Sequence, residues 1–93
     1  MESAHSATAR ARLEALQANL TPRSIATRMD AESLAVLAAN DEQVDTITCK
    51  PWPPDSDAWW YFDCTGTAIA EAGDVIGAAL AIVGNLRRSR ARA

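Results

Sequence analysis

The chain has 93 residues, 48% of them hydrophobic and 23% charged, and its formal net charge at pH 7 is −3. A single domain over residues 1–93 is expected, because chains divide into separate cores only well beyond about 200 residues, and the apolar run 75–83 is too short to span a membrane. Arg10, Arg12 and Glu14 interrupt the N-terminal segment, which therefore lacks the apolar run of a secretory signal and predicts a cytoplasmic protein.

The charges are divided along the chain. Ten carboxylates and a single lysine lie within residues 30–74, while eight arginines and two glutamates lie outside that segment. An acidic middle of this kind is typical either of solvated faces or of a surface oriented toward a basic partner protein. Alanine is the commonest residue and arginine replaces lysine almost throughout, which is typical of proteins from high-GC bacteria and their phages.

The first predicted element is an amphipathic helix over residues 6–19. Ala9, Leu13, Leu16 and Leu20 recur at helical spacing, with polar residues on the opposite side. The single apolar stripe of this helix requires a partner surface.

Two further helices are expected next. Thr21 and Pro22 form a start signal, because the Thr oxygen can accept hydrogen bonds from unpaired amides and proline at the first helical position loses no hydrogen bond. The helix that begins at Pro22 is predicted to end near Met29, and Asp30 can cap another over residues 31–39. The pattern leaves open whether these are two helices or one bent helix.

The middle of the chain has the period of strands. Residues 44–50 alternate and are rich in β-branched side chains, and Pro51 is expected to end this strand because proline cannot donate to a ladder. A second strand over residues 58–63 leads into a turn in which Gly66 takes a positive φ angle. Residues 67–70 are then expected to form a short third strand.

The last predicted element is a long C-terminal helix that Asp74 is placed to cap. Its apolar positions follow helical spacing at Ile76, Ala79, Leu80 and Val83. Residues 1–5 and 88–93 are expected to form disordered tails. The predicted fold class is a small single-domain α+β protein, with N-terminal helices, a three-stranded antiparallel meander made of a two-stranded hairpin and a short third strand, and the C-terminal helix packed on the sheet.

All five aromatic residues lie in one stretch, residues 52–62. We expect the first two strands to pair so that Ile47 faces Phe62 and Cys49 faces Trp60. Because side chains alternate across a sheet, this register places Trp60 and Phe62 on a core face.

The opposite face of the sheet then carries Trp59 and Tyr61, with Trp52 in the adjacent proline loop. The sequence leaves open whether the N-terminal helices cover this face. If uncovered, it is typical of a protein-binding surface, because Trp and Tyr supply much of the binding energy in protein interfaces. The three aromatic side chains are the expected anchors. Three neighbouring carboxylates are expected to attract a basic partner: Asp55, Asp57 and Asp63.

The sequence therefore predicts a non-enzymatic protein-protein interaction module or small regulator. One form of such a protein is a phage product that binds a host protein. It leaves open a homodimer through the same surface. Catalysis is not expected, because the single histidine, His5, lies near the terminus without a paired nucleophile, and the chain has no glycine-rich phosphate loop.

Cys49 and Cys64 are expected to be free, buried thiols. Cytoplasmic thiols stay reduced, and the expected register places the two cysteines too far apart for a disulfide. No metal or other cofactor is expected, because two distant cysteines and His5 do not make a tetrahedral site.

Residues 21–40, TPRSIATRMDAESLAVLAAN, resemble a helix-turn-helix segment, with Asp30 at the turn. The resemblance rests on small and apolar residues at the positions that pack the two helices: Ile25, Ala26, Met29, Val36 and Ala39. It implies DNA binding, although a recognition helix that presents Glu32 in place of basic side chains would repel DNA, so nucleic acid is not the expected partner. The arginines of this alternative are Arg23, Arg28, Arg87, Arg88 and Arg90.

Overall fold

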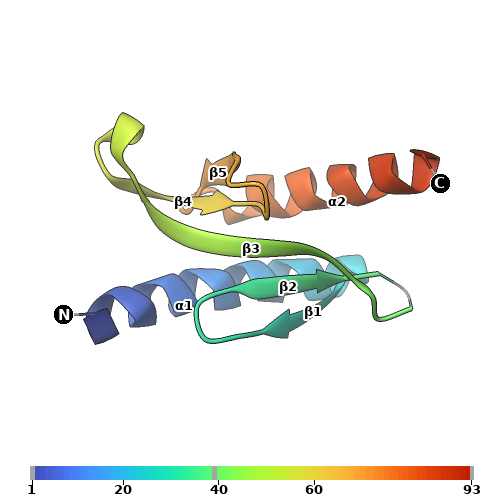
Figure 1. The fold of residues 1–93 in the computed structure, drawn as a ribbon, viewed down its shortest axis with the longest axis horizontal. Coiled ribbons are helices and arrows are strands. Elements are labelled where there is room, and N and C mark those ends of the chain that lie inside the picture. Colours follow the sequence, from blue (N-terminus) through green and yellow to red (C-terminus); the bar gives the residue numbers. More distant parts are fainter. Residues whose placement is uncertain (1, 39, 93) are drawn as a thin grey trace.

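The computed structural model describes residues 2–38 and 40–92, with side-chain burial described for residues 8–38 and 40–88. The elements in chain order are α1 Glu2–Leu20, η1 Thr21–Arg23, β1 Ala26–Met29, β2 Leu34–Leu37, β3 Gln43–Trp52, η2 Pro53–Asp55, β4 Ala58–Phe62, β5 Ala68–Glu71 and α2 Val75–Arg92, where η marks a 3-10 turn. The five strands form one antiparallel sheet in the order β1-β2-β3-β4-β5. In Figure 1 the long strand β3 crosses the middle of the molecule, with β1 and β2 on one side and β4 and β5 on the other.

Both predicted terminal helices are present, but the predicted apolar face of α2 is partly wrong. Ile76 and Leu80 are each 56% exposed, while Ala78, Ala79 and Ile82 are buried. α1 buries the predicted stripe of Ala9, Leu13, Leu16 and Leu20. α2 follows Asp74 as predicted, because Gly77 N–H donates a hydrogen bond of 3.0 Å to Asp74 Oδ1. The disorder expected for residues 1–5 and 88–93 stays a prediction. Positions 1 and 93 lie outside the described residues.

The two helices predicted over residues 22–29 and 31–39 are wrong. The Thr-Pro start signal begins only the single turn η1, which ends where Ser24 enters the left-handed region at φ 61°. The chain then forms the hairpin β1–β2, and a hydrogen bond of 2.9 Å from Asp30 N–H to Ser33 C=O closes its turn. The sheet therefore has five strands, and the predicted three-stranded meander is wrong as well.

Pairing with β3 explains why β2 is a strand. Leu34 pairs with Ile47, and Leu34, Ala35 and Val36 are all fully buried. A run of four apolar residues suits a buried strand and a helix equally, so tertiary pairing decides its conformation. The helix-turn-helix resemblance fails on the same finding, because β1 and β2 take the place of its helices among the described residues. Ala39, one of its anchor positions, lies outside the described residues.

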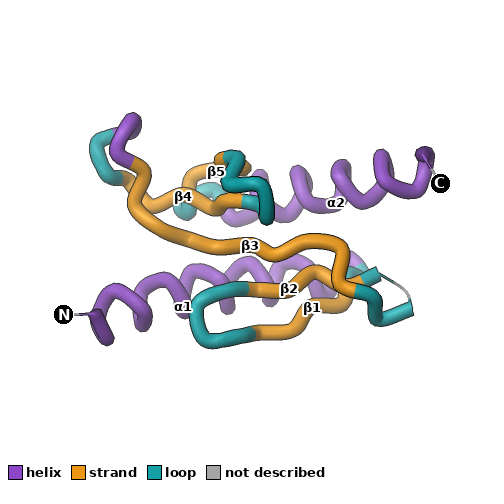
Figure 2. The backbone as a smooth tube through the Cα atoms, viewed as in Figure 1, coloured by secondary structure: helices purple, strands orange, loops and turns teal. Residues whose placement is uncertain are grey.

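β3 is longer than predicted and passes through Pro51 to Trp52. Its two halves have different partners, because residues 43–47 pair with β2 and residues 48–52 pair with β4. Figure 2 shows the resulting stagger, in which the β1–β2 hairpin lies toward one end of β3 and the β4–β5 hairpin toward the other. Each half of β3 therefore has a strand neighbour on one side only, which is where a sheet tolerates proline.

The predicted register of β3 and β4 is wrong by one residue. Cys49 lies opposite Tyr61, whereas the prediction placed it opposite Trp60. A shift of one residue turns every side chain of a strand to the other face. Trp59 and Tyr61 therefore face the helices, and Trp60 and Phe62 face away from them.

The loop between β3 and β4 sets this register. It spans residues 53–57 and closes Trp52 against Ala58. Ser56 and Asp57 follow η2 in the left-handed region, at φ 53° and 60°. Two successive non-glycine residues with positive φ are uncommon, so the sequence does not predict this conformation.

The predicted turn between β4 and β5 is confirmed, since Gly66 has a φ of 84°. Asp63 holds this turn, because its Oδ1 accepts hydrogen bonds from Thr65 N–H at 2.9 Å and from Thr67 N–H at 3.1 Å. The Thr65 hydroxyl also donates to this oxygen at 2.6 Å and is the main cause that lowers the pKa of Asp63.

Both helices pack on the same face of the sheet. Tyr61 is fully buried there, and its hydroxyl donates a hydrogen bond of 2.7 Å to the carbonyl of Arg12 in α1. The core combines both helices and the sheet: Leu13, Leu16, Leu20, Ile25, Leu34, Val36, Ile47, Cys49, Tyr61, Ala72, Ala78, Ala79 and Ile82. We call the opposite side of the sheet, which points away from both helices, the outer face.

Candidate functional site

The outer face of the sheet carries a cluster of aromatic side chains. Strand alternation places Lys50 and Trp52 of β3 on this face, next to Trp60 and Phe62 of β4. Trp52 and Trp60 are partly exposed, while Phe62 is almost fully buried. We call Trp52, Trp60 and Phe62 the aromatic cluster.

The three rings of the aromatic cluster pack edge to face. The ring centroids of Trp52 and Trp60 lie 4.8 Å apart at an interplanar angle of 63°, and those of Trp52 and Phe62 lie 6.2 Å apart at 79°. Aromatic pairs prefer this geometry, which contributes about 0.5–1.5 kcal/mol per pair beyond burial. Lys50 Nζ lies 5.0 Å from the centroid of Phe62, within the range of a cation–π contact. The cluster is therefore an ordered group of side chains.

A hydrogen bond fixes the Trp60 side chain of this cluster. Trp60 Nε1 donates a hydrogen bond of 2.8 Å to Asp55 Oδ2. Asp55 ends η2, the turn that directly follows Trp52, so one short loop positions both indoles. Side chains that are already held in place lose less conformational entropy when a partner binds.

Carboxylates surround the aromatic cluster. Asp55 is bonded to Trp60, Glu71 of β5 lies directly opposite Trp60, and Asp57 is exposed in the loop. With Lys50 included, these three carboxylates and one ammonium group give a local charge of −2. This charge favours a partner with basic groups around an apolar contact.

The structure brings only part of the predicted site together. Trp52 and Asp55 belong to the outer face, and Asp57 lies in the adjoining loop. Tyr61 is 0% exposed and lies in the core, and Trp59 is half-buried on the helix side, where it packs against the core. The expectation that Trp59 and Tyr61 form the open surface is therefore corrected.

Trp60, Phe62 and Lys50 of the outer face are absent from the predicted site. In β3 the polar residues Thr48 and Lys50 alternate with apolar ones and reveal which side is outward. β4 has the sequence AWWYF, with no charged side chain on either face. Its register with β3 alone therefore decides which side chains point outward. Asp63, also predicted for the site, instead holds the β4–β5 turn.

The arginines of the DNA-binding alternative are spread over several elements. Arg23 lies in η1, Arg28 in β1, and Arg87 and Arg88 in α2, all of them exposed. Arg23 donates a hydrogen bond to the carbonyl of Asn19, and Arg28 donates to Gln43 Oε1. The side chain of Arg90 lies outside the described residues.

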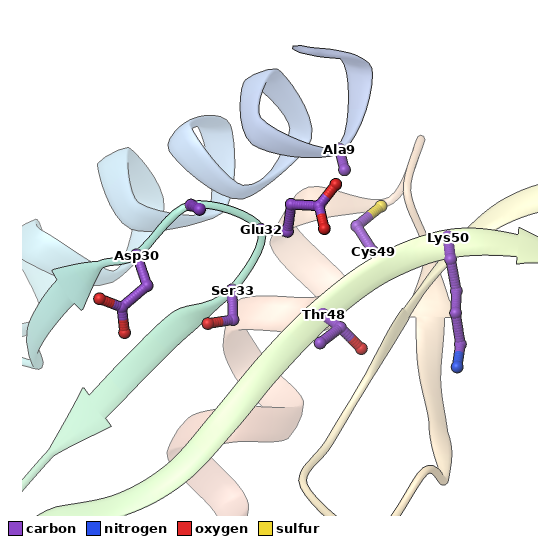
Figure 3. A pocket seen from close by; sticks show the side chains of 8 residues that line it. Ala9, Asp30, Glu32, Ser33, Thr48, Cys49 and Lys50 are labelled. Atoms are coloured by element: carbon purple, nitrogen blue, oxygen red, sulfur yellow. The ribbon is translucent and has the colours of Figure 1, made fainter. Parts of the chain in front are cut away.

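A cavity of about 540 Å³ lies at the edge of β3, next to the β1–β2 turn. Its lining comes from α1, the turn and β3: Ala9, Asp30, Ala31, Glu32, Ser33, Thr48, Cys49 and Lys50. Figure 3 shows that Cys49 and Glu32 point toward Ala9, whereas Thr48 and Lys50 point away from it. The cavity therefore opens beside the backbone of β3, between the helix side and the outer face.

The thiol in this cavity is not activated. Burial raises the pKa of Cys49 to about 11, although the nearby charge of Arg12 acts to lower it. A thiol with this pKa is almost entirely protonated at neutral pH and is a poor nucleophile. Cys64 is exposed, contrary to prediction, and its contact with Asp45 raises its pKa. Both cysteines are free.

Comparison of the chain with protein-family models, with curated proteins and with solved structures found no match. No helix in the described part of the chain is long and apolar enough to cross a membrane. Within residues 2–38 and 40–92, no three side chains of His, Cys, Asp or Glu are grouped so that they could hold a metal ion.

Proposed function

We propose that this chain is a non-enzymatic protein-interaction module that binds another protein through the outer face of its sheet. The aromatic cluster is the centre of the proposed interface, and Trp60 is its main anchor. The observation that carries the proposal is the fixed arrangement of Trp52, Trp60 and Phe62 on the side of the sheet away from both helices.

The composition and order of the cluster support this function. Tryptophan is enriched among the residues that dominate interface energies, especially where its ring is held in place by neighbours. The edge-to-face packing of Trp52 and Trp60, with the bond from Trp60 to Asp55, holds both rings before a partner arrives. The cost of ordering these side chains is therefore small at the moment of binding.

The charges around the cluster support a basic partner. Glu71, directly opposite Trp60 on β5, and Asp57 in the adjoining loop are both exposed and would form the polar rim of the interface. Rim charges act mainly on the association rate and on partner choice, so binding through this face should weaken as salt increases. The free thiols favour a reducing, cytoplasmic setting for this interaction.

The test is a quantitative capture experiment with lysate from a high-GC bacterium, using the wild-type chain and two single variants. Trp60→Ala removes the proposed anchor, and Leu80→Ala removes a side chain that is 56% exposed on α2, away from the outer face. Thermal unfolding of each variant first confirms that it folds.

The proposal predicts a discrete protein captured by the wild type and by Leu80→Ala, with a loss of about tenfold or more for Trp60→Ala. Equal capture by all three chains contradicts the outer face as the binding site. Size-exclusion chromatography with light scattering tests the homodimer, because a dimer that Trp60→Ala dissociates would make a second copy the partner.

A further inference from the structure

The stagger of the sheet leaves part of β3 with an unpaired edge. On the β2 side, pairing stops where Leu34 meets Ile47. Residues 48–52 of β3 pair only with β4, on the other side. If β2 began before Leu34, its added residues would lie next to residues 48–52 of β3. The β1–β2 turn and the cavity shown in Figure 3 occupy that position instead.

The backbone groups that face this edge can be identified. Asp57 N–H donates a hydrogen bond of 3.1 Å to Trp52 C=O, so the carbonyl of Trp52 points toward β4. Backbone groups of successive strand residues point to alternate sides, so the edge receives the N–H and C=O groups of Cys49 and the C=O of Pro51. Cys49 N–H is then the one donor of residues 48–52 that faces this edge, because Pro51 has none.

The opposite unpaired edge of β3 is closed by a side chain. There, Asp45 Oδ1 accepts hydrogen bonds from Thr46 N–H at 2.8 Å and from Cys64 N–H at 3.0 Å, which joins β3 to the β4–β5 turn. At the Cys49 edge, a hydrogen bond of 2.9 Å from Asp30 N–H to Ser33 C=O closes the neighbouring turn. Of the two half-edges, one is filled by the protein and the other faces a cavity.

We propose that the Cys49 edge of β3 accepts an extended segment of the partner protein as an added strand. Strand addition to a sheet edge is a common mode of peptide recognition, in which main-chain hydrogen bonds supply affinity and alternate side chains supply specificity. This inference rests on the proposed function, since the added strand would lie beside Lys50 and Trp52 of the outer face and extend the same interface.

The lining of the edge defines the chemistry of the segment. Its residue opposite Cys49 points into the cavity toward Ala9 and is small or apolar. Within a partner that is basic overall, the single neighbour opposite Lys50 points to the outer face and is acidic, since opposite charges in cross-strand pairs are favourable. Pro51 has no N–H to donate, so the added strand can bond only to Cys49 and to the C=O of Pro51 and is therefore short.

The probe for this edge is a phage-displayed library of random peptides about 12 residues long, selected on the wild-type chain. Ala31→Trp fills the cavity from the exposed turn, and Ala31→Ser is its matched control. We expect selected peptides to bind Ala31→Trp about tenfold or more weakly, and Ala31→Ser and Leu80→Ala like the wild type. In NMR spectra of the wild type they should shift the amide signals of residues 48–50 and slow the exchange of Cys49 N–H about tenfold or more.

The proposal is overturned if no peptide is enriched, if Ala31→Trp binds the peptides normally, or if bound peptides leave the Cys49 amide unprotected. Peptides that shift only the indole signals of Trp52 and Trp60 would overturn the edge while supporting the outer face. If Ala31→Trp loses protein capture and Trp60→Ala does not, the result supports strand addition at the Cys49 edge and contradicts the proposed function of the outer face.

Discussion

Cys49 and Tyr61 lie opposite each other on β3 and β4, and both side chains are buried beneath the helices. Because side chains alternate along a strand, this pair determines which residues of β3 and β4 face the helices, and it directs Trp60 and Phe62 to the outer face. The aromatic residues that fill the core and those that reach the surface are therefore neighbours in sequence but belong to different layers.

The first prediction concerns the unequal roles of Tyr61 and Trp60 in stability. Tyr61→Ala should lower the free energy of unfolding by about 3–5 kcal/mol, because it leaves a cavity in the core. Tyr61→Phe should lower it by about 1 kcal/mol through loss of the hydrogen bond to Arg12. Trp60→Ala should cost less than half as much as Tyr61→Ala, since Trp60 is partly exposed. Denaturant unfolding followed by circular dichroism measures all three; the reverse order would contradict the register.

The second prediction concerns alkaline pH. Burial raises the pKa of Tyr61 from 10.0 to about 12 and that of Cys49 from 9.0 to about 11. The folded state therefore holds protons that the unfolded state has lost, so stability should fall as pH rises from about 9 toward 12. The unfolding midpoint in denaturant should be lower at pH 10.5 than at pH 8, and Tyr61→Phe should show a smaller decrease. A midpoint that does not change with pH would contradict the burial of both groups.

The third prediction separates the two thiols. At pH 8 a thiol with a pKa of about 11 is only ~0.1% ionised, and Cys49 is buried as well. Cys64 is exposed and should react with iodoacetamide well before Cys49, whose modification should require unfolding. Mass spectrometry of the peptides after timed alkylation gives the order. Equal rates in the folded protein would place Cys49 at the surface.

The fourth prediction concerns the bond between Asp55 and Trp60. Asp55→Ala should lower the free energy of unfolding by about 1 kcal/mol and speed solvent exchange of the Trp60 indole N–H, because its acceptor is removed. Asp57→Asn is the matched control, since Asn also tolerates the positive φ at that position. An indole signal that responds to both variants equally would show that Asp55 has no special contact with Trp60.

The elements that could be predicted are those whose signals are local. The stripe of Leu13 and Leu16, the cap Asp74 and the turn glycine Gly66 each act within a few residues, and the structure has a helix or turn at each of them. The strand over residues 44–50 was found for the same reason, since its alternation is visible without knowledge of its partners.

The elements that could not be predicted depend on distant contacts. The LAVL run becomes β2 only because β3 is there to pair with it, and its helix-forming composition points the other way. The orientation of AWWYF depends on a loop with two left-handed residues, Ser56 and Asp57, which shifts the register by one. Of the predicted site residues, Trp52 lies on the outer face through the alternation of β3 and Asp55 follows it in η2, whereas the position of Trp60 depends on the register.

Binding of another protein by the outer face can be followed at the indole rings of Trp52 and Trp60. The most direct measurement is fluorine NMR of the chain labelled with 5-fluorotryptophan, before and after addition of the protein that the wild type captures. We expect the Trp52 and Trp60 signals to shift or broaden, while Trp59, on the helix side, serves as the internal control and changes little. A response of Trp59 without one from Trp60, or no response from any of the three, would contradict binding through the outer face.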